Sequence, residues 1–357
     1  MTELNSGIGA HTIAEILSEP ATWTACLQHV EQTTELQSLN ESLAKEIEWV
    51  FVGCGSSFYL AQSAAASWSI LTGKRARAIP ASEIMIFPQT LPVPCQPVLI
   101  SRSGNTSEIV RTAEYFERDL NIRTLAITCG TNTGLQKISS HTIRLPDADE
   151  KSTVMTRSFT SMLLVLQSLA GVRGNQRDFL NGVRELPEQV AAQLPGIHAA
   201  VKSLVHGSTF ADYVFLAQGA FFGIAQESML KVKEMSCSYA QSFHTLEFRH
   251  GPKAIVSPET LITFILSDSG FDAEVAVLEE IKQLGGKTLA ITNTANAVVR
   301  NSADFLVELS LEVPETARAA ASVLPGQMLG FYTGLKKGLN PDEPRNLSRV
   351  VMLESSK

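Results

Sequence analysis

The chain has 357 residues, of which 44% are hydrophobic and 18% are charged, a composition that excludes a disordered chain and favours a globular protein with two domains. Its net charge of −7, without any basic block, argues against a nucleic-acid partner. Because no apolar stretch reaches the ~18 residues of a membrane span and the first residues lack the basic start of a signal peptide, we expect a cytoplasmic protein with no membrane partner.

The first half of the chain predicts helices followed by alternating strands and helices. Residues 1–48 are expected to form an N-terminal helical segment, whose last helix covers about 39–48. The apolar run 49–52 predicts a buried strand, and further strands are expected over 97–100, 124–128 and 141–145, with helices between them. This alternation predicts a parallel sheet that is covered by helices on both faces.

Segments of the first half recur in the second half in the same order. The strand sequence TLAIT at 124–128 recurs identically 164 residues later, and the run 50–52 is echoed at 214–216 with the same offset. The segment 263–270 parallels 97–104 after a shift of two more residues. A match of strand, turn and strand in one order predicts an internal duplication.

We therefore expect two tandem α/β/α domains, each a parallel flavodoxin-like sheet with helices on both faces. The expected boundaries divide the chain into an N-terminal helical segment, a first domain, a helical linker, a second domain and a C-terminal tail: 1–48, 49–172, 173–206, 207–339 and 340–357.

A polar turn, Ser101-Arg102-Ser103-Gly104-Asn105-Thr106, follows the strand 97–100 and precedes a helix. Free backbone N–H groups, the helix dipole and three hydroxyls can converge there on an anion, above all a phosphate. A serine-rich helix cap without a ligand is the alternative. In the second copy Asp268 would repel a phosphate and Phe271 replaces a polar residue, so we expect one phosphate site, in the first copy.

A second turn, Gly53-Cys54-Gly55-Ser56-Ser57, lies at the carboxyl end of the first strand, where glycines let a ligand approach the backbone. A tight turn without a ligand is equally compatible with these residues. The spacing is not that of a dinucleotide motif, and the five cysteines form neither a metal-ligand pattern nor a disulfide framework. We expect no metal and no other cofactor, and buried thiols.

Three charged residues, Glu227, Lys231 and Glu234, share one face of a predicted helix because their spacings are four and three. A solvated face with ion pairs is the simple alternative. Small and apolar neighbours favour instead a carboxylate held near a lysine, which is suited to act as a general base. His250, before a Gly-Pro break, is a candidate for proton transfer, and composition leaves His244 equally eligible.

Together these residues resemble the tandem sugar isomerase (SIS) domain family, from about residue 15 to the end. The chain is similar to the isomerase half of glucosamine-6-phosphate synthase and to the tagatose/galactosamine-6-phosphate isomerase and deaminase group. The turn 101–106 resembles the family's S-x-S-G-x-T phosphate turn, and 153–160 resembles the segment that closes over the sugar. The run 227–234 resembles the E-x-x-L-K-x-K-E catalytic helix, and 248–253 the histidine loop.

The resemblance implies that Glu234 moves a proton between C1 and C2 of an open-chain sugar and that His250 opens the ring. In the synthase that histidine comes from the neighbouring subunit. Lys231 would stabilise charge on the sugar oxygens or help to place Glu234. The implied substrate contacts are Gly55, Ser57, Ser101, Arg102, Ser103, Thr106 and Thr156. A homodimer with a shared active site, the tail lying over that site, and no cofactor are also implied.

Two residues depart from the synthase pattern. Arg102 replaces a glutamine, as in the S-R-S-G-N turn of the isomerase/deaminase group, and is suited to pair with the phosphate. Arg349, a catalytic candidate, stands where the synthase has an imine-forming lysine, a role that arginine cannot fill. The sequence also carries no glutaminase domain. We therefore expect an isomerase of a hexose or hexosamine 6-phosphate coupled to deamination, with a fructosyl-amine-6-phosphate deglycase or a non-catalytic sugar-phosphate sensor as alternatives.

Overall fold

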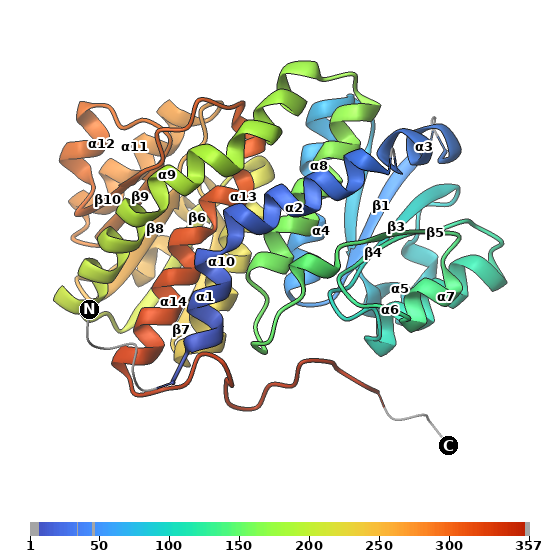
Figure 1. Cartoon of the computed structure of the whole chain (residues 1–357). Coiled ribbons are helices and arrows are strands. Elements are labelled where there is room, and N and C mark those ends of the chain that lie inside the picture. Colours follow the sequence, from blue (N-terminus) through green and yellow to red (C-terminus); the bar gives the residue numbers. More distant parts are fainter. Residues whose placement is uncertain (1–6, 34, 45–46, 354–357) are drawn as a thin grey trace. The chain divides into compact units, whose positions relative to one another are not determined.

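The computed structural model describes residues 7–33, 35–44 and 47–353, and these residues form two five-stranded parallel sheets (Figure 1). The chain divides into two compact units, and each unit carries one sheet. The first-sheet unit comprises residues 21–150, 155–184 and 348–353, and the second-sheet unit comprises residues 7–20, 151–154 and 185–347. The predicted α/β class with two tandem parallel sheets is confirmed.

In the first sheet the strand order is β2-β1-β3-β4-β5, and all neighbouring strands are parallel. Its strands are β1 (Glu48–Gly53), β2 (Ala76–Pro80), β3 (Cys95–Ile100), β4 (Leu125–Thr128) and β5 (His141–Arg144). The helices along this half of the chain are α2 (Glu19–Gln32), α3 (Glu35–Ser42), α4 (Ser56–Thr72), α5 (Ala81–Ile86), α6 (Ser107–Glu114), α7 (Gly134–Ile138) and α8 (Arg157–Arg173). The central strand β3 is buried along its whole length, as a strand covered on both faces should be.

Alternate side chains of β1 show that helices cover both faces of the first sheet. Val50 and Val52 belong to a core cluster that includes Ile84 of α5 and Ile109 of α6. The opposite face carries Trp49, whose ring stacks on that of Trp68 in α4 at a centroid distance of 3.6 Å. The period of two along a strand therefore divides one apolar run between two helical layers.

The second sheet repeats the topology of the first, with the order β10-β9-β8-β6-β7 and parallel neighbours. Its strands are β6 (Asp212–Ala217), β7 (Tyr239–His244), β8 (Thr260–Ile265), β9 (Lys287–Thr292) and β10 (Phe305–Glu308). The other helices are α1 (Ala10–Leu17), α9 (Arg177–Gly207), α10 (Phe222–Ser236), α11 (Phe271–Gln283), α12 (Ala297–Ser302), α13 (Ala319–Ser322) and α14 (Leu324–Lys336). Equal strand orders are what an internal duplication predicts.

The sequence did not predict the edge strands β2 and β7, and it extended the third N-terminal helix too far. An edge strand is paired on one side only, so polar sequences such as that of β7 are accommodated there. The helix predicted to reach residue 48 ends at Ser42, and Glu48 instead opens β1. The Glu48 carboxylate pairs with Arg77 on β2 at 2.5 Å, which favours the strand at this position.

All five cysteines are free thiols. Cys26, Cys95 and Cys129 are buried, as expected, whereas Cys54 is only half-buried. The prediction of a buried thiol is wrong for Cys237, which is exposed and follows the last residue of α10 as its C-cap, in the left-handed conformation with φ of 48°.

Glycines allow α14 to approach α10 closely in the second-sheet unit. Gly326, Gly330 and Gly334 recur every four residues along one face of α14. A Cβ at Gly330 would lie 2.6 Å from the carbonyl oxygen of Lys231, and the other two glycines face α10 equally closely. The helix that carries the predicted base is therefore held against a neighbour that has no room for side chains at these positions.

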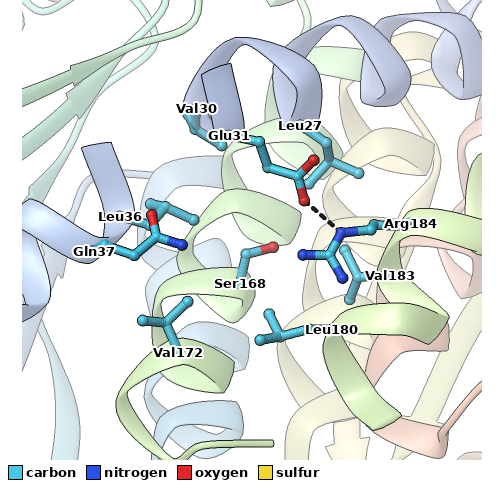
Figure 2. A pocket seen from close by; sticks show the side chains of 10 residues that line it. All are labelled: Leu27, Val30, Glu31, Leu36, Gln37, Ser168, Val172, Leu180, Val183 and Arg184. Atoms are coloured by element: carbon cyan, nitrogen blue, oxygen red, sulfur yellow. Dashed lines mark hydrogen bonds and ion pairs between the residues drawn. The ribbon is translucent and has the colours of Figure 1, made fainter. Parts of the chain in front are cut away.

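A small pocket in the first-sheet unit lies between α2, α3, α8 and α9 (Figure 2). Its volume is about 40 Å³, enough for one or two water molecules, and an exposed ion pair between Glu31 and Arg184 (2.6 Å) borders it. None of the predicted site residues lines this pocket. Among the described helices, none is both long enough and apolar enough to cross a bilayer.

Candidate active site

The polar turn after β3 belongs to the first-sheet unit and is held in a tight form by Gly104. The Gly104 N–H donates to the Ser101 hydroxyl (3.1 Å), and Gly104 has φ of +63°, a conformation that suits glycine. A Cβ at this position would lie 2.5 Å from the Thr133 hydroxyl oxygen. Another residue would therefore have to displace the turn or its neighbour.

The end of β4 fixes the same turn from the next strand. The carbonyl of Arg102 accepts hydrogen bonds from the N–H groups of Cys129 and Gly130, both at 3.0 Å, and from the Thr128 hydroxyl at 3.0 Å. Ser103 and Thr106 stay partly exposed. The turn is thus held by β4 while two of its hydroxyls stay accessible. This arrangement suits an anion site at the carboxyl ends of parallel strands.

A buried carboxylate, Glu150, links two of the predicted residues. The Arg102 side chain is almost fully buried, and its Nη1 pairs with Glu150 Oε2 at 3.2 Å. The other oxygen of Glu150 accepts from the backbone N–H (2.5 Å) and hydroxyl (2.8 Å) of Thr156 at the start of α8. Free N–H groups and the helix dipole stabilise a carboxylate at that place. Glu150 thus positions both Arg102 and Thr156.

Sequence reasoning missed Glu150, although a signal was present. The residue precedes Thr156 and Ser158, which begin a helix, and acidic residues favour such starts because they accept hydrogen bonds from the free N–H groups. The Arg102 guanidinium is directed at this carboxylate. Its pairing with a substrate phosphate stays a prediction.

Gly55 lies in the turn between β1 and α4, and Ser57 is the second residue of α4. Gly55 has φ of +55°, and a Cβ on Gly53 would come within 2.3 Å of the Ser57 backbone, so both glycines are required by the turn. The Ser57 side chain is buried, and its hydroxyl lies 3.9 Å from the sulfur of Met155. The turn therefore places Ser57 beside the residue that precedes Thr156.

The last described part of the tail contacts the polar turn within the first-sheet unit. Arg102 Nη2 donates to the carbonyl of Arg349 (3.2 Å), and the Arg349 side chain pairs with Asp149 at 2.6 Å. Farther along, the Ser107 N–H at the start of α6 donates to the carbonyl of Val351 (3.3 Å). A catalytic role for Arg349 stays a prediction.

The earlier part of the tail belongs to the second-sheet unit. There Asp342 accepts hydrogen bonds from the N–H groups of His11 (3.1 Å) and Thr12 (2.7 Å) and from the Thr12 hydroxyl (2.7 Å). Asp342 therefore satisfies free N–H groups in the first turn of α1, a role that an acidic residue fills well.

Three charged side chains of α10 lie together in the second-sheet unit. Lys231 Nζ lies 3.1 Å from Glu227 Oε1 and forms a second, shorter ion pair with Glu234. The side chains of Glu227 and Lys231 are 0% exposed, whereas 17% of the Glu234 side chain is exposed. The alternative interpretation of this face as solvated is therefore wrong.

The charges around Lys231 keep it a cation. Burial lowers the pKa of its ammonium group, but attraction to Glu227 and Glu234 and the hydrogen bonds to both outweigh burial, so the pKa lies above its usual value. Glu234 is the member of this triad that reaches the surface, and its ion pair with Lys231 holds it in place.

The candidate His244 ends the edge strand β7. Its ring stacks on Phe222 at a centroid distance of 3.7 Å. Burial lowers the pKa of the His244 imidazole, and the nearby Glu247 carboxylate opposes that shift only in part. His244 is therefore packed against a ring and predominantly neutral at pH 7.

The candidate His250 is exposed on a loop that a distant carboxylate fixes. Glu280 of α11 pairs with Arg249 at 2.7 Å and with Lys253 at 2.6 Å, on either side of the histidine. Within the part of the chain that the structure describes, no hydrogen bond or ion pair joins His250 to Glu234. The predicted acid–base pair is thus not linked by a direct contact within one chain.

The turn after β8 binds a carboxylate of the same chain through its backbone. The N–H groups of Asp268 and Ser269 donate to Glu315 Oε1 at 2.6 and 3.0 Å. The Asp268 carboxylate, which was expected to repel anions, pairs instead with Arg318. The expectation that phosphate binds only to the first copy stays a prediction.

The structure divides the predicted site residues into two sets, one in each unit. The first-sheet unit holds the binding residues and Arg349, and the second-sheet unit holds Lys231, Glu234 and His250. In the described ranges, no group of three His, Cys, Asp or Glu side chains is placed to hold a metal ion.

The SIS domain family matches this chain over residues 42–171 and 212–333, which together exceed half of its length and contain the two sheets. The chain is similar to glutamine–fructose-6-phosphate aminotransferase (isomerizing) of Methanothermobacter thermautotrophicus, with 24% identity over 346 residues that cover 96% of this chain and 57% of that enzyme. The chain thus spans less than two thirds of the length of the curated relatives that it matches.

Two solved structures share the fold over nearly the whole chain. Glucosamine-6-phosphate deaminase from Thermotoga maritima is 28% identical, with a TM-score of 0.78 and coverage of 96% of this chain and 99% of that one. Tagatose-6-phosphate ketose/aldose isomerase from Escherichia coli is 22% identical, with a TM-score of 0.83 and coverage of 96% of both chains. The second likeness establishes the fold alone.

Proposed function

Because the chain belongs to the SIS domain family, we propose that it is a phosphosugar isomerase that acts on a hexose or hexosamine 6-phosphate. On an amino sugar the same proton transfer releases ammonia, so we propose deamination coupled to isomerisation. The reaction needs a base, a ring-opening group and stabilisation of oxyanions, and these are functions that side chains supply without a metal or redox cofactor.

The observation that carries this proposal is the buried triad on α10. A buried lysine between two carboxylates would serve no purpose on a binding surface, and such a pair is at best a weak source of stability. Here it fixes one partly exposed carboxylate, Glu234, with its charge balanced by Lys231. A positioned carboxylate of this kind is what proton abstraction next to a carbonyl requires.

In the proposed reaction the turn 101–106 binds the phosphate and leaves the other end of the open-chain sugar to react. His250 assists ring opening, and Glu234 then removes the proton from C2 and returns it to C1. With a hydroxyl on C2 the product is the ketose. With an amino group the product is a C2 imine, and one water molecule hydrolyses it to the ketose and ammonia.

The relatives support the two parts of the proposal to different degrees. The solved deaminase is 28% identical and covers nearly the whole chain, which supports deamination of an amino-sugar phosphate. The curated relatives carry the word isomerizing in their names, which supports the aldose–ketose step. The fructosyl-amine deglycase and the sensor have no comparable support.

A panel of substrates tests the proposal directly. The protein is incubated with the 6-phosphates of glucosamine, galactosamine, fructose, tagatose and fructosyl-amine, and ammonia and ketose are measured. We expect ketose and ammonia in equal amounts from one amino sugar. Tight binding of one sugar phosphate without turnover of any would establish a sensor and overturn the enzyme.

The base is tested with Glu234→Gln, which keeps the size of the side chain and its contact with Lys231. We expect turnover to fall by about 10²–10⁴-fold, the usual contribution of general acid–base catalysis. Glu279→Gln, an exposed residue of α11, is the matched control and should leave turnover unchanged. Full turnover by Glu234→Gln would show that another group is the base.

We also propose a homodimer in which His250 of one protomer serves the active site that contains the other protomer's Glu234. Light scattering measures the assembly, and mixing two inactive variants tests the sharing. Glu234→Gln and His250→Ala chains, unfolded and refolded together, should regain about a quarter of the wild-type turnover, because half of the dimers are mixed and each has one intact site. No recovery from a mixture of confirmed heterodimers would place both residues in one chain's site.

A further inference from the structure

The second copy of the polar turn, Ser267-Asp268-Ser269-Gly270, surrounds a carboxylate of the same chain. Two consecutive N–H groups, those of Asp268 and Ser269, donate to Glu315 Oε1 at 2.6 and 3.0 Å. The Ser269 hydroxyl donates to the other oxygen, Oε2, at 2.5 Å. Consecutive backbone donors that converge on one anion form a nest, the geometry that proteins use for phosphate and carboxylate groups.

This turn matches the turn of the first copy in its internal hydrogen bond. The Gly270 N–H donates to the Ser267 hydroxyl (2.9 Å), just as the Gly104 N–H donates to the Ser101 hydroxyl (3.1 Å). The residues that bind Glu315 therefore correspond to Arg102 and Ser103. The copies differ beyond the glycine, because α11 starts with Phe271, directly after Gly270, whereas α6 starts with Ser107, three residues after Gly104.

Groups of both signs lie at the second turn. The buried Glu274 carboxyl accepts hydrogen bonds from the Ser267 N–H (2.7 Å) and hydroxyl (3.1 Å), and Arg318 supplies positive charge. The side chain of Arg318 is 4% exposed, and its Nη2 pairs with the Asp268 carboxylate, which neutralises the charge that would oppose an anion. Arg318 Nε is buried without a hydrogen-bond partner in the part of the chain that the structure describes. A buried guanidinium N–H without an acceptor costs free energy, and a nearby anion offsets part of that cost.

We propose that the turn 267–270 is a second anion-binding site of phosphate and carboxylate type, and that Glu315 is its built-in occupant. A tethered carboxylate competes at a high effective concentration, so free phosphate does not displace it. The second domain thus keeps the site of the first domain in a closed form. This inference rests on the turn itself and is independent of the catalytic proposal.

Removal of the tethered carboxylate tests the inference. Isothermal titration calorimetry with inorganic phosphate counts the anions bound by the wild type, Glu315→Ala and the control Glu312→Ala, an exposed residue three positions earlier. Sodium chloride keeps the ionic strength equal. We expect one more phosphate per chain in Glu315→Ala than in the other two proteins, and a larger rise of its melting temperature with phosphate.

A second variant keeps the test decisive if Glu315→Ala folds poorly. Glu315→Gln retains the shape of the side chain but not its charge, and it should also gain a phosphate. Adding Ser269→Ala to either variant should weaken the additional site at least tenfold and leave the first one unchanged. Equal stoichiometry in the wild type and both Glu315 variants, or an additional site that is insensitive to Ser269→Ala, would overturn the inference.

Discussion

Replacement of Lys231 by methionine should expose how the charge triad of α10 is balanced. Methionine has nearly the volume of the lysine stem, so the change removes a charge without leaving a large cavity. Glu227 would then keep a buried carboxylate from which the cation, 3.1 Å away, is missing. Glu234, which is 17% exposed, can regain water, so the cost falls mainly on Glu227.

The expected loss follows from burial at this position. Removing one partner of a buried ion pair costs about 3–5 kcal/mol, and the 0% exposure of Glu227 leaves no solvent to reduce that cost. A loss of about 3 kcal/mol in the free energy of unfolding corresponds to roughly 100-fold faster hydrogen exchange of the amides that exchange through this unfolding. Because protonation in acid removes the charge of the buried Glu227 carboxylate in this variant, the loss of stability should be smaller at pH 5 than at pH 8.

The assay has to report on the second-sheet unit. All three tryptophans, Trp23, Trp49 and Trp68, lie in the first-sheet unit, so their fluorescence does not observe α10 directly. Urea unfolding followed by circular dichroism, together with hydrogen exchange of peptides from 222–236, observes it. A Lys231→Met protein within 1 kcal/mol of the wild type at pH 8 would refute the reasoning.

A double variant separates charge from packing. Glu227→Gln together with Lys231→Met removes both buried charges, and replacement of a whole buried pair is often neutral. We therefore expect the double variant to be at least 1 kcal/mol more stable than Lys231→Met alone. Equal stability of the two variants would mean that lost packing, not the stranded carboxylate, causes the effect.

Two more predictions concern packing and pH. Gly330→Ala should lower the free energy of unfolding by about 1–3 kcal/mol, because the new Cβ would lie 2.6 Å from the Lys231 carbonyl oxygen. Gly196→Ala in α9 should raise it by up to about 1 kcal/mol, because no atom lies within 4 Å of the new Cβ. Urea midpoints of both variants test these expectations. Burial raises the pKa of Glu274 to about 7, although hydrogen bonds from Ser267 oppose the shift. A raised carboxyl pKa gives stability that is present below the unfolded-state value near 4.3 and is lost as pH rises through about 7. Stability should thus fall by up to about 3 kcal/mol from pH 4.5 to 8 in the wild type, and urea midpoints of Glu274→Gln should show a weaker dependence.

The sequence predicted the parts of the fold that depend on local pattern. The buried strands β1, β3 and β4 contain the apolar runs 49–52, 97–100 and 125–127, and short runs of this kind that alternate with helical patterns are typical of a covered parallel sheet. The edge strand β7 has no such run, since partial exposure admits polar residues. Its existence depends on pairing with β6, which no local pattern records.

The residues of the site were predictable where one element carries them together. Glu227, Lys231 and Glu234 share a helix, so their spacing alone brings them into contact. Glu315 escaped prediction because it accepts hydrogen bonds from a turn 46 and 47 residues earlier, and a lone glutamate gives no sign of which distant backbone donors it will meet. Glu150 lies only six residues before Thr156, so the helix start at Thr156 was a signal that the prediction from spacing did not use. The roles proposed for the predicted residues in catalysis stay predictions.

The two copies carry different groups at corresponding positions. The first helix after the first strand is α4 in one copy and α10 in the other, and the first turn after β3 corresponds to the turn after β8. In the first copy the helix start carries the small residues Gly55 and Ser57, and the Arg102 side chain of the turn pairs with Glu150. In the second copy the corresponding helix carries the buried charge triad, and Glu315 fills the turn. A closed second turn would prevent a phosphate from binding there, because the backbone donors that would hold it already bind Glu315.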